Sequence, residues 1–247
     1  MYEVALRRRE PVAEGTLAFY FDKPAGFSHE AGQNAIFTLV EPPAMDAAGP
    51  SRPFTIASAP QEPELMIATR MRDSAFKRYL AAAAPGTKLQ IDGPAGIMVL
   101  HEDASRPAVF LAGGIGITPF LAMARDAAKR GLPHNVSLFY SNRRPQDAAF
   151  LAELERLQRP KFRLISTMTA APDWRGERRL ISRELLAEHV PDLRAPIYYF
   201  AGPPGMTMGC RGCSPSSACP RRTCAPKSST VIETLARLVS SNAPWQA

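Results

Sequence analysis

The stretch from Ala112 to Pro119 reads AGGIGITP, and it constrains the fold more than any other part of the chain. It follows the apolar run Ala108–Ala112, which is typical of a buried strand, and it leads into a helical pattern that ends at Gly131. Thr118 suits the N-cap of that helix, and Pro119 suits its first turn, where a missing N–H costs nothing. The sequence therefore predicts a strand, a tight turn and a helix in direct succession.

Glycine is the residue that lets such a turn form and lets the backbone come close to a ligand. Gly113, Gly114 and Gly116 occupy this turn, and Ile117 and Thr118 follow at the start of the helix. A turn of this kind gathers free N–H groups at a helix N-terminus, which suits a phosphate or pyrophosphate. The alternative is an ordinary corner between a strand and a helix, with no ligand.

The hydrophobic pattern changes near residue 102. Before that point, short β-type runs alternate with turns rich in Pro, Gly and Asp, and one helical stretch, Ser74–Ala83, interrupts them. This pattern is typical of a small antiparallel β-barrel that carries one helix. The predicted strands are Gly15–Phe21, Gln33–Val40, Pro53–Ser58, Glu64–Met71, Thr87–Asp92 and Gly96–Leu100.

From Pro107 onward strands and helices alternate, which predicts an α/β domain with a parallel sheet and helices on its faces. The polar segment His101–Pro107 marks the boundary between the two patterns. We therefore divide the chain into a barrel domain (1–102), an α/β domain (103–209) and a tail (210–247). The predicted strands of the second domain are Ala108–Ala112, Val136–Tyr140, Phe162–Thr167 and Ile197–Ala201, and its helices are Thr118–Arg130, Gln146–Leu157 and Ser182–Glu188.

Composition excludes several classes of protein. At 247 residues the chain is long enough for two cores, and no apolar run is long enough to span a bilayer. The N-terminal arginines are not followed by the apolar segment of a secretory signal, so a cytoplasmic location is the expectation. The four histidines are scattered without ligand spacing, and we expect no metal.

The net charge of +7 invites a nucleic-acid interpretation, but its distribution argues against one. More than half of the excess lies after Met208, where five Arg and Lys residues stand against Glu233 alone. The body of the chain has no long basic run and no cysteine. We therefore expect no nucleic-acid partner.

A second motif, RPFTIAS at Arg52–Ser58, stands about sixty residues before the glycine turn. Strand side chains alternate between faces, so Arg52 and Phe54 share one face and Thr55 turns to the other. Arginine suits a phosphate through forked, charge-assisted hydrogen bonds, and phenylalanine offers a stacking surface. Taken alone, the motif also fits an edge strand with a surface arginine.

The order of these motifs resembles the ferredoxin–NADP⁺ reductase superfamily, over residues 1 to about 206. Within it the chain is similar to the stand-alone bacterial NAD(P)H:flavin oxidoreductases, on the runs Met71–Lys77 and Tyr140–Asp147. The motifs that carry the resemblance are RPFTIAS, a helix start at Ser74, Gly93–Gly96, the glycine turn and Gly202–Met206.

The resemblance implies FAD as a bound cofactor, NADPH or NADH as the electron donor, and a role for each motif. Arg52 and Ser74 would hold the FAD phosphates, and Phe54, which replaces the usual tyrosine, would stack on the flavin. Thr55, the one residue assigned to the catalytic site, would hydrogen-bond the flavin nitrogen that accepts hydride. The remaining cofactor-binding candidates are Pro53, Ile67, Ala68 and Thr69 beside the flavin, and Gly113, Gly114, Gly116, Ile117, Thr118, Gly202, Pro203 and Gly205 around the pyridine nucleotide.

Three polar residues follow the second strand of the α/β domain, where such folds bind the adenosine ribose. Ser141, Arg143 and Arg144 are these residues, and the arginines suit the extra phosphate of NADPH. A solvated turn is the alternative.

The family pattern stops after Met206, and the tail that follows holds all four cysteines, Cys210, Cys213, Cys219 and Cys224. Their spacing matches no metal motif that we can justify. Read in the adjacent frame with GC-rich codons, Cys213 to Glu233 becomes MLAELGVPEEDVRTEEFDGY and a stop. That string predicts an amphipathic helix, a turn and a strand, and it resembles the normal C-terminus of the family. We hypothesise a frameshift near Met208 and expect a poorly ordered tail.

These patterns lead to one functional hypothesis with two alternatives. The chain is expected to be a flavoprotein that transfers hydride from NAD(P)H to FAD and electrons to an unidentified acceptor, either a separate iron–sulfur protein or a small molecule. One alternative is a nucleotide-binding module impaired by its altered tail. The other is a metal- or nucleic-acid-binding protein that uses the Cys- and Arg-rich tail.

Overall fold

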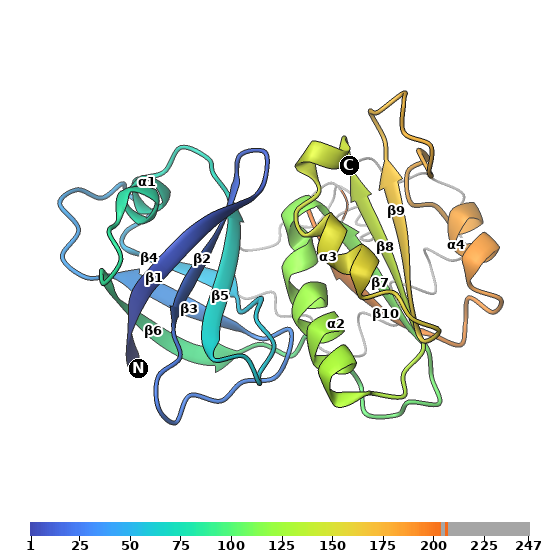
Figure 1. Ribbon diagram of the computed structural model, residues 1–247, viewed down its shortest axis with the longest axis horizontal. Coiled ribbons are helices and arrows are strands. Elements are labelled where there is room, and N and C mark those ends of the chain that lie inside the picture. Colours follow the sequence, from blue (N-terminus) through green and yellow to red (C-terminus); the bar gives the residue numbers. More distant parts are fainter. Residues whose placement is uncertain (204–205, 207–247) are drawn as a thin grey trace, which may run out of the picture.

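The computed structural model describes residues 1–203 and 206, and these form two sheets lying side by side (Figure 1). The first sheet has six antiparallel strands in the order β4-β3-β6-β1-β2-β5. Its strands are β1 (Tyr2–Ala13), β2 (Thr16–Asp22), β3 (Asn34–Leu39), β4 (Ser51–Thr55), β5 (Glu64–Arg70) and β6 (Lys88–Ala95), and helix α1 (Ala75–Ala82) lies between β5 and β6 in the chain.

The second sheet has four parallel strands in the order β10-β7-β8-β9. Together the two sheets confirm the predicted fold class. The strands are β7 (Ala108–Gly113), β8 (Val136–Asn142), β9 (Phe162–Met168) and β10 (Ile197–Ala201). The helices are η1 (Gly114–Ile117), α2 (Thr118–Arg130), η2 (Pro145–Asp147), α3 (Leu151–Arg156) and α4 (Arg183–His189).

The two edges of the first sheet approach each other, so the sheet curls into a barrel. Just beyond β4, the Ala57 N–H donates to the Met66 carbonyl of β5 at 2.7 Å, and the Ser58 hydroxyl accepts from the Met66 N–H at 3.0 Å. Large aromatic side chains fill the interior, as small barrels require. Among them Phe19, Phe21 and Phe37 are fully buried.

The parallel sheet is covered on both faces. Helices α2 and α3 lie on the face toward the barrel, and α4 lies on the opposite face (Figure 1). For this reason every residue of the central strand β7 is buried and apolar or glycine, as in other doubly covered parallel strands. None of the helices within residues 1–203 is long and apolar enough to cross a bilayer.

Helix α2 joins the two halves through apolar packing and through the side chain of Arg125. Its apolar side chains share a single cluster with barrel residues such as Met66 and Ala68. Arg125 of α2, with a side chain only 16% exposed, donates to both carboxylate oxygens of Glu153 at 2.6 and 2.8 Å. Held by Glu153 of its own half, the same guanidinium reaches across to the barrel, where it donates to the Ala57 carbonyl at 3.3 Å and pairs with Glu62 at 3.5 Å. These contacts hold the barrel against the nucleotide half.

Several predicted elements need correction. Gly96–Leu100 is not a strand, because β6 ends at Ala95 and the apolar residues beyond it, including Met98, anchor an irregular segment against the α2 core. The predicted helix Gln146–Leu157 is two short pieces, since Phe150 takes a left-handed conformation (φ 61°) between them. Strand β1 was not predicted. The dividing residue between the two halves stays a prediction.

The helix start at Thr118 also differs from its prediction. Thr118 is already helical, and its hydroxyl donates to the Ile115 carbonyl at 3.2 Å instead of accepting from an N–H as a cap would. The 3-10 turn η1 lies in front of it, so the N–H groups at the helical start belong to Gly114, Ile115 and Gly116. At Ser74 the prediction is confirmed: its hydroxyl caps α1 by accepting from the Lys77 N–H at 3.3 Å.

Candidate functional site

The first part of the site lies where β4 passes the N-terminal turn of α1. Arg52 and Phe54 point to the same side, and both lie on Phe76 of α1, with the Arg52 guanidinium 5.5 Å and the Phe54 ring 5.7 Å from its ring centre. Ser74 caps the same helix. Thus Arg52, Phe54 and Ser74, predicted separately from the sequence, lie around one helix start. Thr55 is half-buried at the end of β4, on the other face of the strand from Phe54, and Pro53 is exposed.

This helix start gathers positive charge that the sequence interpretation missed. Lys77 extends its ammonium to the Arg70 carbonyl at 2.7 Å. Burial lowers the pKa of Lys77, and the neighbouring charges of Arg72 and Arg52 lower it further, so three cations lie near one another. The only sequence signal for this cluster was the basic composition of residues 70–78. Cations beside a helix N-terminus suit an anion with two or more charges.

A carboxylate holds the anion position in this structure. Asp46 accepts from Arg52 Nη2 at 3.0 Å and from the Ala75 N–H, in the first turn of α1, at 2.9 Å. The hydrogen bond from Ala75 is the main cause that lowers the pKa of Asp46, and bonds from Ala48 and Arg52 add to it. The Arg52 guanidinium and the Ala75 N–H therefore bind an oxyanion, and this arrangement fits the phosphate groups of FAD.

Strand β5 forms a free edge of the barrel beside this helix. The N–H and C=O groups of Met66 point away from β2, toward Ser58 and Ala57. Because this orientation repeats every second residue in an antiparallel strand, the backbone groups of Ala68 also point to the free edge. The side chains of Ile67, Ala68 and Thr69 are all buried. Of the three predicted residues, Ala68 is thus the one that offers backbone donors and acceptors to a ligand.

The second part of the site is the glycine turn, which lies at the carboxyl ends of β7 and β10. The chain continues from β7 to β8 on one side, while β10 lies on the other, and open α/β sheets bind ligands at such a reversal of strand order. Gly113 pairs in register with Ser141 of β8. Gly202 and Pro203 lie directly against Gly113. The predicted residues Gly113, Gly116, Ser141, Gly202 and Pro203 are therefore together, whereas Gly205 lies outside the described residues.

The glycines of this turn do different things. A Cβ atom on Gly116 would lie 2.6 Å from the Gly202 nitrogen and closer still to the Ala201 carbonyl, so Gly116 allows two backbones to cross. Gly114 has a left-handed conformation (φ 53°), and a Cβ atom there would meet nothing within 4 Å among residues 1–203 and 206. Within the described part of the chain, the start of η1 therefore has open space beside Gly114.

This difference gives a prediction for stability. Gly116→Ala is expected to lower the free energy of unfolding by about 3 kcal/mol, because backbone must move to admit the methyl group. Gly114→Ala is the matched control and should cost only about 1 kcal/mol, the usual strain of a left-handed alanine. Urea denaturation of both variants checks the order, and an equal cost for the two would contradict the packing role of Gly116.

At the end of β8 the two candidate arginines are not equivalent. Arg144 is paired with Asp147 at 3.0 Å and with Glu14 at 3.0 Å. Arg143 is exposed, and no ion pair to its guanidinium occurs within residues 1–203 and 206. The buried Ser141 hydroxyl has no hydrogen-bond partner in the same part of the chain. Arg143 and Ser141 are thus available to a ligand, and Arg144 is already engaged.

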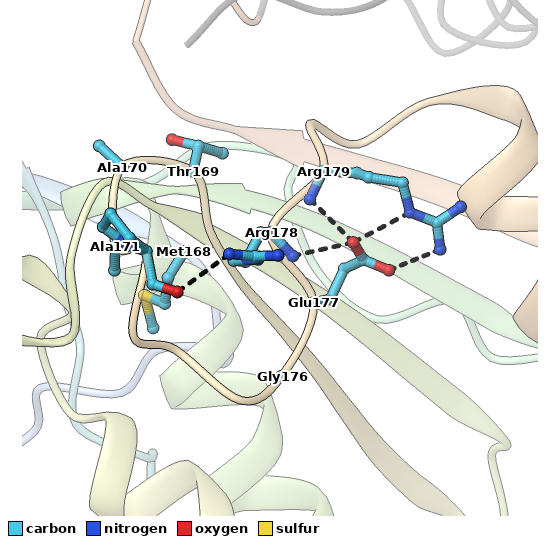
Figure 2. Close-up of a pocket in the computed structure, with 9 residues that line it drawn as sticks. Met168, Thr169, Ala170, Ala171, Gly176, Glu177, Arg178 and Arg179 are labelled. Carbon is cyan, nitrogen blue, oxygen red and sulfur yellow. Dashed lines mark hydrogen bonds and ion pairs between the residues drawn. The ribbon is translucent and has the colours of Figure 1, made fainter.

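A shallow pocket of about 760 Å³ lies beyond β9, in the loop from Met168 to Arg179 (Figure 2). Arg178 donates to the Pro172 carbonyl at 2.9 Å. Figure 2 shows Glu177 accepting from Arg179. Hydrogen bonds from the Arg179 side chain, and after them from the backbone N–H groups of Arg179 and Arg178, lower the pKa of Glu177 to about 2. The loop is tied to the end of β8 through the Ala170 N–H and the Arg143 carbonyl at 2.8 Å. The pocket therefore adjoins the Arg143 turn, a feature that the sequence interpretation missed.

The two parts of the site meet across the junction of the halves, because β5 is in contact with η1. The free edge of the barrel thus lies next to the glycine turn. Within the described residues no group of three or more His, Cys, Asp or Glu side chains is arranged to hold a metal ion. The cysteine tail lies outside the described residues, as do the proposed frameshift and the predicted tail domain 210–247.

Comparisons with known proteins agree with this geometry. Residues 110–212 match the family model of the oxidoreductase NAD-binding domain. Ferredoxin–NADP reductase B of Sorangium cellulosum is 29% identical over 210 residues, which are 82% of each chain. The ferredoxin–NAD⁺ reductase component of an alkene monooxygenase system from Xanthobacter autotrophicus is 32% identical over 148 residues. That match covers 58% of this chain and 45% of the relative, so the chain spans less than half of this longer protein.

A solved structure shares the whole fold. The ferredoxin NADP⁺ reductase from Neisseria gonorrhoeae, solved with bound FAD and NADP, superposes with a TM-score of 0.72. The match covers 96% of this chain and 91% of that one, at 19% identity. At this identity the likeness shows a common fold, with a barrel followed by a parallel sheet.

Proposed function

Because the chain belongs to the ferredoxin–NADP⁺ reductase superfamily, we propose that it is an FAD-dependent NAD(P)H oxidoreductase that passes electrons to a separate acceptor. The observation that carries this proposal is the contact between β5 and η1. It places the strand edge that would line the flavin beside the glycine turn that would bind the pyridine nucleotide. When bound, FAD takes a hydride from NAD(P)H and releases electrons to the acceptor. The protein's part is to bind and orient both cofactors.

The barrel would hold FAD. Arg52, Lys77 and the first N–H groups of α1 supply the positive charge that its diphosphate needs. Phe54 supplies a ring for the flavin to pack on, Ala68 supplies backbone hydrogen bonds, and Thr55 supplies a hydroxyl for the reacting nitrogen. These assignments rest on the family resemblance together with the positions of the side chains.

The α/β half would hold the pyridine nucleotide. The N–H groups of η1, with open space beside Gly114 in the described part of the chain, suit its pyrophosphate. Ser141 and Arg143 suit the ribose and its extra phosphate. With both cofactors bound, the two halves would bring the nicotinamide and the flavin together, and no side chain would have to donate or accept a proton in the hydride transfer.

The ion pairs at the end of β8 give a prediction for nucleotide preference. Arg143→Ala is expected to raise the KM for NADPH about 10-fold and to change that for NADH less than about 2-fold, because only NADPH carries the extra phosphate. Arg144→Ala is the matched control, since its guanidinium is already bound by Asp147 and Glu14. Steady-state kinetics with both nucleotides tests this, and equal effects of the two substitutions would contradict it.

The cofactor assignment is tested by binding. Protein mixed with excess FAD and passed through a desalting column is expected to retain one FAD per chain, and riboflavin, which has no phosphate, should be lost. A protein that keeps neither flavin would contradict the proposed function.

The acceptor class is tested with the reduced protein. We expect a [2Fe–2S] ferredoxin to accelerate its reduction of cytochrome c, and no acceleration would point to a small-molecule acceptor.

A further inference from the structure

The loop between β3 and β4 encloses the arginine that would bind the FAD phosphates. Arg52 Nη1 donates to the carbonyls of Ala48, Gly49 and Ser51 at 2.7 to 2.8 Å. Its Nη2 donates to Asp46 at 3.0 Å. The guanidinium therefore has three hydrogen bonds to this loop and a fourth to the first residue of β4. Only the bond to Asp46 brings a negative charge.

The Asp46 carboxylate is negatively charged, and it also uses the hydrogen-bond donors that a phosphate would use here. One carboxylate oxygen accepts from Arg52 and from the Ala48 N–H at 3.1 Å, and the other accepts from the Ala75 N–H of α1. A phosphate bound here would use the same guanidinium and the same helix N–H. Two anions on one set of donors repel each other, so one of them must leave.

We propose that Asp46 competes with the diphosphate of FAD for Arg52 and the first turn of α1, and so sets the affinity of the chain for phosphate-bearing flavins. The inference rests on the proposed function, because it takes FAD as the ligand. The Asp46 side chain is 36% exposed, so it reaches water without crossing the core. FAD binding is then an exchange of one anion for another, and its net free energy is smaller than the phosphate contacts alone would give.

Competition predicts opposite effects on the flavin-free protein and on flavin binding. Asp46→Asn keeps an oxygen for the Ala75 N–H but removes the charge that pairs with Arg52. The flavin-free variant should melt at a lower temperature than the parent. Its Kd for FAD should fall about 10-fold, measured by quenching of flavin fluorescence, while that for riboflavin should change less than about 2-fold. A residue that merely orders the site would weaken FAD binding when substituted.

Asp73→Asn is the matched control. Asp73 lies just before the same helix, its side chain is 87% exposed, and it is paired with Arg78 instead of Arg52. The substitution changes net charge by the same amount, and we expect it to alter the Kd for FAD less than about 3-fold. If Asp46→Asn does not fold, Asp46→Ser is measured in its place.

The outcomes separate the inference from the function on which it rests. If the parent protein binds FAD and Asp46→Asn binds it equally or more weakly, the inference is wrong and the proposed function stands. The inference is also wrong if Asp73→Asn tightens FAD binding as much, or if riboflavin binding tightens in parallel. If the parent protein binds no FAD at any concentration and neither Asp46 variant restores binding, the proposed function itself fails.

Discussion

Replacing Arg52 with alanine is expected to raise the Kd for FAD about 100-fold, which corresponds to about 3 kcal/mol for lost charge-assisted hydrogen bonds. Arg52 is the cation that lies over Phe76, next to the Phe54 ring and the capped start of α1. Without it, Asp46 also loses its partner and stays near the helix N-terminus as a competing anion. Both changes disfavour a diphosphate. Fluorescence titration with FAD measures the effect.

Two comparisons make the Arg52 result specific. Arg52→Lys keeps the charge but loses the forked geometry, so its Kd for FAD should lie between those of the parent and of Arg52→Ala. Riboflavin has no phosphate, and its affinity should be the same in all three proteins. A parallel loss of riboflavin binding would mean that Arg52 supports the structure of the barrel, not the phosphate.

Returning the gene to the adjacent reading frame at Met208 is expected to accelerate flavin reduction by NADPH about 100-fold, because a misplaced nicotinamide costs a factor of that order. The restored string, ending MLAELGVPEEDVRTEEFDGY, resembles the C-terminal helix and strand of the family, whose last aromatic segment lies near the flavin and the nicotinamide. The Kd for FAD should change less than about 3-fold, since the barrel supplies the FAD contacts.

The frame hypothesis is open to a direct check before any kinetics. The codons of Cys213 to Glu233 must give the restored string and its stop when read one nucleotide out of frame. A nucleotide sequence that gives a different string would contradict the frameshift hypothesis. So would a parent protein that already reduces its flavin with NADPH as fast as the frame-restored protein.

Most of the fold follows from hydrophobic pattern and turn residues. Ser74 and Gly131 bound their helices as expected, since a hydroxyl cap and a left-handed glycine act locally. The errors arose where tertiary packing decides. Phe150 breaks a helical pattern by turning left-handed while its ring is buried, and Met98 packs on the core without joining a strand. No local pattern contains that information.

Candidate site residues can be predicted from the sequence where a short motif suits one kind of ligand contact. The sequence points to the glycine turn and to Arg52 as candidates, and in the structure Arg52 and Phe54 both lie on Phe76 while Gly202 lies against Gly113. Asp46, Lys77 and the loop around Arg178 were missed, because they reach the site from loops or through long side chains. One of the two ion pairs that distinguish Arg144 from Arg143 is made by Glu14, which lies far away in the chain. The spacing of residues along the sequence does not predict an ion pair between residues so far apart.

The measurement that tests the central claim most directly is an anaerobic equilibrium titration of the FAD-loaded protein with NADPH and then with NADH. We predict that the visible absorption band of the flavin bleaches with about one equivalent of nucleotide, however slowly equilibrium is reached. Readmission of an acceptor should restore the band. A protein that holds FAD while its band stays unchanged at saturating NADPH and NADH would contradict the account.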